Sequence, residues 1–232
     1  MTTLLLVRHG RTTANTAGVL AGWTPGVGLD EIGREQVTAL AARLAEVPMA
    51  AVVTSPLQRC QETAAALVAG RSNLPVHVDD AVGEVRYGDW TGQSLKTLTK
   101  DPMWKVVQGH PSAAVFPGDG GEGLAAMQAR AVAAVRRWNH DLGNDAVYVV
   151  VSHGDVIKSI LTDAVGAHLD QFQRIMVDPA SVSIVSYTAT RPFVVRVNDT
   201  GGSLAGLRPR KRSRRKSRAS DAVVGGGAGE AI

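Results

Sequence analysis

The sequence contains a single cysteine, Cys60, and no apolar run long enough to cross a membrane. One cysteine excludes a disulfide within the chain, and it agrees with a reducing compartment. A membrane-spanning helix needs roughly 18–20 predominantly apolar residues. The apolar residues 4–7 are too few for the core of a signal peptide, and no basic residue precedes them. We therefore expect a cytoplasmic protein without a membrane segment.

Most of the chain lacks the positive charge that its overall balance suggests. The sequence has 25 Lys and Arg against 21 Asp and Glu, a net charge of +4. Eight of these basic residues and two of the acidic ones lie in residues 201–232, which leaves 17 basic and 19 acidic residues, a net charge of −2, in residues 1–200. The high isoelectric point is therefore a property of the C-terminal tail.

The tail also has few large apolar side chains. Residues 199–232 are rich in Gly, Ser, Ala, Arg and Lys. Such a composition buries too little apolar surface to offset the conformational entropy lost on ordering. We therefore expect a folded domain over residues 1–198 and a disordered basic tail over 199–232.

Short β-branched runs alternate with longer helical patterns in residues 1–198, which is typical of βαβ units and a mainly parallel sheet. Strands are expected at residues 4–8, 51–54, 76–78 and 147–152, and a terminal antiparallel pair at 183–187 and 193–197. Helices are expected at residues 30–46, 58–69, 124–141 and 156–165, the second of them starting at Ser55-Pro56. The pattern thus predicts an α/β fold.

Two histidines follow predicted strands in the same way. His9 lies in Arg8-His9-Gly10 after the first strand, and His153 lies in Ser152-His153-Gly154 after the strand at 147–152. Ligands of open α/β sheets bind at the carboxyl ends of the strands. We therefore expect the two histidines to lie side by side at one edge of the sheet.

Arg59 and Glu84 occur in two further segments that follow predicted strands. Arg59 falls in the first turn of the helix at 58–69, where the helix macrodipole favours an anion rather than a cation. A bound phosphate would reverse that preference, because the guanidinium and the helix N-terminus would both face it. Residues 83–92 combine Glu84 with Arg86, Tyr87 and several glycines, a mixture suited to a pocket wall.

These four segments, in this order, resemble the histidine phosphatase superfamily, which includes the cofactor-dependent phosphoglycerate mutases. The resemblance covers residues 4 to about 190 and also includes Asn15, which matches an asparagine that helps to hold phosphate in the family. It implies a three-layer α/β/α sandwich of the phosphoglycerate mutase type. It also implies a metal-independent phosphatase that acts on small-molecule phosphate esters without a cofactor.

The resemblance implies a role for each matched residue. His9 would attack phosphorus and form a phosphohistidine, with neighbouring positive charge keeping the imidazole neutral. Arg8, Arg59 and His153 would clamp the phosphate. Glu84 would protonate the leaving alcohol and then activate water, which requires a pKa raised toward neutral pH.

Several alternatives stay open at this point. Mutases of the family carry extra chain between the glutamate segment and the second histidine, and only 68 residues separate Glu84 from His153, which favours hydrolysis over a mutase reaction. Residues near Gly22 depart from the usual family pattern where the non-reacting part of the substrate would lie, so the substrate is open. The basic residues 208–218 are a candidate for weak, non-specific nucleic-acid binding. A homodimer is also left open, because family members often form dimers.

A cysteine-dependent phosphatase is excluded by the spacing of residues. Its thiolate is followed six residues later by an arginine, whereas Ala66 stands six residues after Cys60. No group of Asp, His and Asn residues with metal-ligand spacing accompanies the candidate site residues. We therefore expect no metal site.

Overall fold

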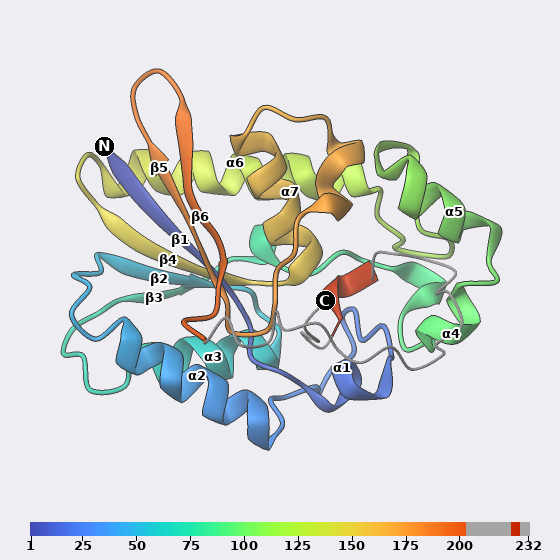
Figure 1. The fold of residues 1–232 in the computed structure, drawn as a ribbon, viewed down its shortest axis with the longest axis horizontal. Coiled ribbons are helices and arrows are strands. Elements are labelled where there is room, and N and C mark those ends of the chain that lie inside the picture. The colour runs from blue at the N-terminus through green and yellow to red at the C-terminus, as the bar shows by residue number, and fades with distance from the viewer. Residues whose placement is uncertain (203–223, 228–232) are drawn as a thin grey trace, which may run out of the picture.

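The computed structural model describes residues 1–202 and 224–227, and a six-stranded sheet forms the centre of this part of the chain. The strands are β1 (Thr2–Arg8), β2 (Ala51–Thr54), β3 (Val76–Val78), β4 (Val147–Ser152), β5 (Val182–Tyr187) and β6 (Pro192–Asp199). They lie in the order β3-β2-β4-β1-β5-β6 (Figure 1). The first four strands are parallel to one another. β5 is antiparallel to β1, and β6 is antiparallel to β5. The predicted parallel sheet with a terminal antiparallel pair is confirmed.

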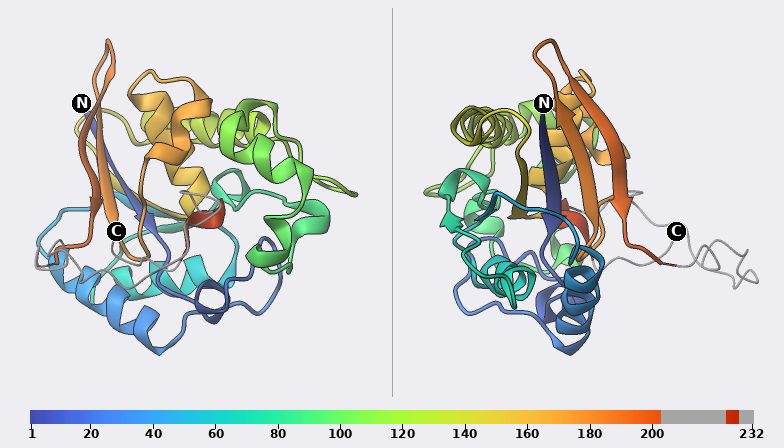
Figure 2. Two further views of the ribbon diagram at one scale, coloured as in Figure 1. Left: turned by 45° about the vertical axis from the view of Figure 1, so that its right-hand side comes forward. Right: turned by 90° about the vertical axis from the view of Figure 1, so that its left-hand side faces the viewer.

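Helices cover both faces of the sheet. The helices of the described chain are α1 (Thr13–Ala17), α2 (Glu31–Arg43), α3 (Gln58–Val68), α4 (Leu95–Leu98), α5 (Pro102–Gly109), α6 (Leu124–Leu142) and α7 (Gly154–Ala164), with short 3-10 turns between some of them. Apolar residues of α2 and α3 form one core with one face of the sheet, and those of α6 and α7 form a second core with the other face (Figures 1 and 2). The expected three-layer α/β/α architecture is confirmed.

The central strand β1 shows why the sequence folds this way. Side chains alternate between the faces of a strand. Leu4 and Leu6 therefore enter the core under α6 and α7, while Leu5 and Val7 enter the core under α2 and α3, and all four are at most 4% exposed. A strand that is buried on both faces appears in the sequence as a continuous apolar run.

Some local predictions differ from the structure. α3 begins at Gln58 rather than at Ser55-Pro56, because the Ser55 hydroxyl bonds to His153 and to the Leu57 amide ahead of the helix. The short helices α1, α4 and α5 were not predicted, since each has too few turns to show a clear apolar period. β6 continues to Asp199, one residue past the predicted domain boundary.

Residues 224–227 also differ from the predicted disordered tail. They form a short 3-10 turn, η6 (Val224–Gly226), followed by Gly227, and Val224 joins the core under α6 and α7 with 1% of its surface exposed. The rest of the predicted tail beyond residue 202, including the basic residues 208–218, lies outside the described residues.

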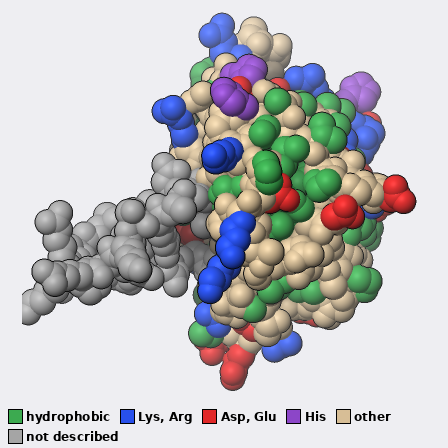
Figure 3. All heavy atoms as spheres, turned by 90° about the vertical axis from the view of Figure 1, so that its right-hand side faces the viewer, with side chains coloured by type: hydrophobic (Ala, Val, Ile, Leu, Met, Phe, Trp, Pro, Cys, Tyr) green, Lys and Arg blue, Asp and Glu red, His purple; other side chains and the backbone are tan. Residues whose placement is uncertain are grey.

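None of the helices in the described residues is both long and apolar enough to span a membrane. The face that carries α4 and α5 exposes apolar side chains together with basic ones and a few histidines (Figure 3). The described surface on that side is therefore mixed in character.

The two-sided core predicts a contrast between two isoleucines in helices. Ile157 in α7 is fully buried, whereas Ile32 in α2 is 44% exposed. We expect Ile157→Ala to lower the free energy of unfolding by about 2–5 kcal/mol, because it leaves a cavity in the core. Ile32→Ala should change it by roughly 0.5 kcal/mol. Urea unfolding of both variants measures the difference, and equal losses would contradict the burial described above.

Candidate active site

The two histidines lie together where β1 and β4 end. β1 pairs with β4 in parallel register, with Arg8 opposite Ser152, so the residue after each strand is a histidine. The ring centroids of His9 and His153 are 5.3 Å apart. The predicted juxtaposition of these two histidines is confirmed.

Gly10 allows the chain to turn closely after His9. A Cβ atom at Gly10 would lie 2.7 Å from the carbonyl oxygen of Gly33 and 2.8 Å from Val37 in α2. Its amide donates to the hydroxyl of Thr63 in α3. The first loop is thereby clamped between two helices, and a larger residue at position 10 would displace His9.

His9 is held with one ring nitrogen as an acceptor. Its Nδ1 lies 2.7 Å from the carbonyl oxygen of Gly10, which can only accept, so Nδ1 carries the proton and Nε2 keeps its lone pair. Burial lowers the pKa of His9 well below its usual value, and the positive charges of Arg59 and Arg8 lower it further. The sequence argument named only the neighbouring charges, whereas burial is the larger cause.

Arg59 and Ser55 fix the second histidine. Arg59 donates from Nη2 to Nδ1 of His153 at 3.2 Å, so Nε2 of His153 carries its proton and donates to the Ser55 hydroxyl at 2.8 Å. The same Nη2 donates to the carbonyl oxygen of Gly22. Burial lowers the pKa of His153 well below its usual value, with the charge of Arg59 next in importance. A neutral imidazole donor and a guanidinium thus lie side by side.

Two helices begin at this point without a capping side chain. His153 is the N-cap residue of α7, and Arg59 lies in the first turn of α3, whose N-cap residue is Leu57. Neither N-cap residue makes a side-chain capping bond. Both positive helix ends therefore add to the preference for an anion.

Glu84 is the carboxyl group of the site. It is only 4% exposed, and its Oε2 lies 3.9 Å from Nη2 of Arg59 and 3.6 Å from Nδ1 of His153. Burial raises the pKa of Glu84 to about 7, with the negative charge of Asp155 as the second cause. Such a carboxyl group exchanges its proton near neutral pH, as a general acid or base must.

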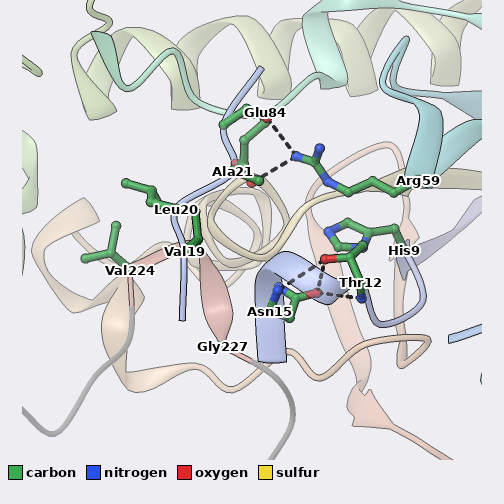
Figure 4. Close-up of a pocket in the computed structure, with 12 residues that line it drawn as sticks. His9, Thr12, Asn15, Val19, Leu20, Ala21, Arg59, Glu84, Val224 and Gly227 are labelled. Carbon is green, nitrogen blue, oxygen red and sulfur yellow. Dashed lines mark hydrogen bonds and ion pairs between the residues drawn. The ribbon is translucent and has the colours of Figure 1, made fainter. Parts of the chain in front are cut away.

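A cavity of about 30 Å³ connects these groups. It is lined by His9, Thr12, Asn15, Val19, Leu20, Ala21, Gly22, Arg59, Glu84, Val224, Gly225 and Gly227. His9 and Arg59 lie across it from Leu20 and Val224 (Figure 4). Asn15 accepts from the amide and hydroxyl of Thr12 through Oδ1, which holds its side chain at the wall.

Four predicted site residues do not line this cavity. Arg8 is fully buried and donates to the carbonyl oxygens of Val177, Gly225 and Gly227. Tyr87 is also fully buried, and its hydroxyl donates to Asp155. Arg86 is exposed, and its guanidinium lies over the ring of Trp23, 4.0 Å from the centroid. His153 likewise does not reach the wall, but it supports Arg59, which does.

Sequence reasoning missed the residues that hold the Glu84 loop in place. Arg130 in α6 donates to the carbonyl oxygens of Ala81, Gly83 and Glu84, and it forms two bonds with the carboxylate of Glu122. The indole of Trp23 donates to the same Glu84 carbonyl oxygen at 2.7 Å. Because these partners are 46–61 residues from Glu84 in the chain, no local pattern indicates them.

In the described residues, Cys60 is not a thiolate at neutral pH, and the acidic residues form no metal-binding group. Burial raises the pKa of the Cys60 thiol to about 12, so the thiol stays protonated at neutral pH. In residues 1–202 and 224–227, no three His, Cys, Asp or Glu side chains gather as a metal site would require.

The environment of Glu84 predicts a measurable titration. We expect its carboxyl group to titrate with a pKa of about 7 in ¹³C NMR of the side chain. Asp155→Asn should lower that pKa toward the usual 4.5, because it removes a negative charge and keeps the shape of the side chain. Asp163→Asn, a change in the same helix near Arg136, is the control and should leave it unchanged. An unshifted Glu84 pKa in Asp155→Asn would contradict the described electrostatics.

Known proteins resemble this chain over most of its length. A bifunctional protein of Mycobacterium tuberculosis, Rv2228c, is 36% identical over 207 residues, which cover 86% of this chain and 54% of that protein. The chain thus spans about half the length of this relative. Phosphoserine phosphatase 1 of Hydrogenobacter thermophilus is 28% identical over 208 residues, covering 86% of this chain and 93% of that protein.

The fold has solved counterparts as well. YhfR of Bacillus stearothermophilus superposes with a TM-score of 0.77 and 28% sequence identity, covering 86% of this chain and 98% of that chain. The sequence profile of the histidine phosphatase superfamily (branch 1) matches residues 4–200, which include both histidines, Arg59 and Glu84. The chain therefore belongs to the histidine phosphatase superfamily, as the resemblance of its motifs predicts.

Proposed function

We propose that this chain is a phosphatase that hydrolyses small-molecule phosphate monoesters, with His9 as its nucleophile. The observation that carries the proposal is the pairing of His9 with Glu84 in one cavity. His9 presents an unprotonated Nε2 and has a lowered pKa, while the pKa of Glu84 is raised to about 7. One group is thus ready to attack, and the other is able to donate a proton.

In the first step, the lone pair of His9 Nε2 attacks phosphorus and the bond from phosphorus to the leaving oxygen breaks. Protonated Glu84 gives its proton to that oxygen, so an alcohol leaves and a phosphohistidine remains. The hydrogen bond from Nδ1 to Gly10 supports the positive charge that develops on the ring. The proton donor matters most for alcohols that are poor leaving groups.

In the second step, water attacks the phosphohistidine. The Glu84 carboxylate takes a proton from the water, the bond from Nε2 to phosphorus breaks, and inorganic phosphate leaves. His9 is again neutral and Glu84 is again protonated, so the cycle closes. No metal ion enters either step in this proposal.

The transferring phosphoryl group would be held by cationic and neutral donors. Arg59 and Asn15 line the cavity, and His153 accepts a hydrogen bond from Arg59. We propose that Arg8, which lies at the end of β1 next to His9, also binds the phosphate. Positioning and neutralisation of charge are the main tasks of a protein in phosphoryl transfer.

Hydrolysis is favoured over a mutase reaction. The relative from Hydrogenobacter thermophilus is named a phosphatase, and it aligns with 86% of this chain. Ala21, between Leu20 and Gly22 in the wall, departs from the usual family pattern, so we assign the choice of substrate to this part of the wall. The wall offers mostly apolar or backbone groups there, which suits the uncharged part of an ester.

The proposal predicts which variants lose activity. Hydrolysis of an aryl phosphate in excess EDTA should persist in the unmodified protein and fall by about 10³-fold or more in His9→Ala, because the nucleophile is lost. Glu84→Gln should cost roughly 10²–10⁴-fold with an alkyl phosphate, whose leaving group needs the acid. Released phosphate is the readout.

His140→Ala, an exposed histidine in α6, is the matched control and should retain full activity. Equal hydrolysis by His9→Ala and the unmodified protein would show that His9 is not the nucleophile. Loss of activity in EDTA would show that the reaction needs a metal ion.

A further inference from the structure

Residues 224–227, here called the C-terminal strap, line the cavity that holds His9, Arg59 and Glu84. Val224 is buried between this cavity and the core, and Gly225 and Gly227 form part of the wall. The strap is the red segment in Figure 1, near the N-terminal end of α7, and Figure 4 shows Val224 and Gly227 beside the cavity. A segment far along the chain thus closes the site.

The strap binds Arg8, one of the residues that we assign to the phosphate. Arg8 donates from Nη2 to the carbonyl oxygens of Gly225 at 3.2 Å and Gly227 at 2.6 Å. Arg8 is fully buried, and a buried guanidinium requires oxygen partners. The carbonyl oxygens of the strap therefore do for Arg8 what phosphoryl oxygens would do in a complex with substrate.

A second contact fixes the strap from the other side. The amide of Gly225 donates to Asp155 at 2.9 Å, and this carboxylate also accepts from the hydroxyl of Tyr87. Gly225 has φ of +74°, and a Cβ atom there would lie 3.1 Å from Leu20. The strap thus makes a left-handed turn that favours glycine, anchored by one cation and one anion.

The strap forms part of the wall of a small cavity of about 30 Å³. An anionic phosphoryl oxygen is a stronger acceptor for a guanidinium than a neutral carbonyl oxygen. The phosphoryl group of a substrate would therefore compete with the strap carbonyl oxygens for Arg8.

We propose that the C-terminal strap is autoinhibitory: it occupies Arg8 in the closed form, and phosphate must compete with it for this residue. The inference rests on the proposed function only in assigning Arg8 to the phosphate. The apparent affinity for phosphate then falls by the fraction of molecules in which the strap is open. A strap that is open in about one molecule in ten weakens binding about tenfold.

The test is calorimetric titration of inorganic phosphate into three proteins: the full chain, a chain without residues 224–232 and a chain without residues 228–232. Removing residues 224–232 should tighten phosphate binding about tenfold. Removing only residues 228–232 keeps the strap and should change the Kd less than twofold. Unfolding midpoints of all three proteins show whether each one is folded.

A point substitution provides a second route that keeps the chain length. Gly225→Val should also tighten phosphate binding, because a β-branched residue at φ of +74° near Leu20 disfavours the closed strap. Gly70→Val is the matched control, since Gly70 has φ of +76° and a Cβ atom there meets no neighbour within 4 Å. It should strain the chain locally without changing the phosphate Kd.

The outcomes separate this inference from the proposed function. Unchanged or weaker phosphate binding after removal of residues 224–232 and in Gly225→Val would overturn the strap proposal, as would a lack of phosphate binding in every variant. Tighter phosphate binding without hydrolysis of any ester would support the strap and reject the phosphatase. Hydrolysis of an ester, with the same phosphate Kd in every variant, would support the phosphatase and reject the strap.

Discussion

Positive charge buried at one end of the sheet is the constraint on which the rest of the site depends. Arg59 is 2% exposed and Arg8 is fully buried, so each guanidinium must find oxygen or nitrogen partners inside the protein. Arg59 bonds to Gly22 and His153, and Arg8 bonds to Val177 and the C-terminal strap. The same charges help to keep both histidines neutral. A bound phosphate is the partner that both arginines would share.

The parallel sheet brings these charges together, and the loops around it set the chemistry. Pairing of β1 with β4 aligns His9 with His153, and α3 brings Arg59 to the same edge. Glu84 comes from a loop that Arg130 holds at three carbonyl oxygens. The scaffold therefore fixes the groups that we propose to bind phosphate, while the proposed proton donor lies in a loop held by a distant helix.

Much of this arrangement was predictable from the sequence, because its causes are local. The apolar run of β1 and the His-Gly pairs at two strand ends predict the parallel register and the paired histidines, and both are confirmed. Arg130 gave no signal, since the carbonyl oxygens of the Glu84 loop that it binds lie about 50 residues away. Val224 gave none either, because two adjacent valines in a Gly-rich tail do not indicate a buried position. Long-range contacts of this kind follow from the fold and not from a local pattern.

The central claim is a covalent bond between phosphorus and His9, and rapid quenching of Glu84→Gln with a ³²P-labelled aryl phosphate tests it most directly. An aryl oxide leaves without an acid, whereas water attack needs the missing carboxylate, so the intermediate should accumulate. We predict about one labelled phosphate per chain, mapped to His9 and absent in the double variant with His9→Ala. Label on another residue, or turnover without any labelled protein, would contradict the account.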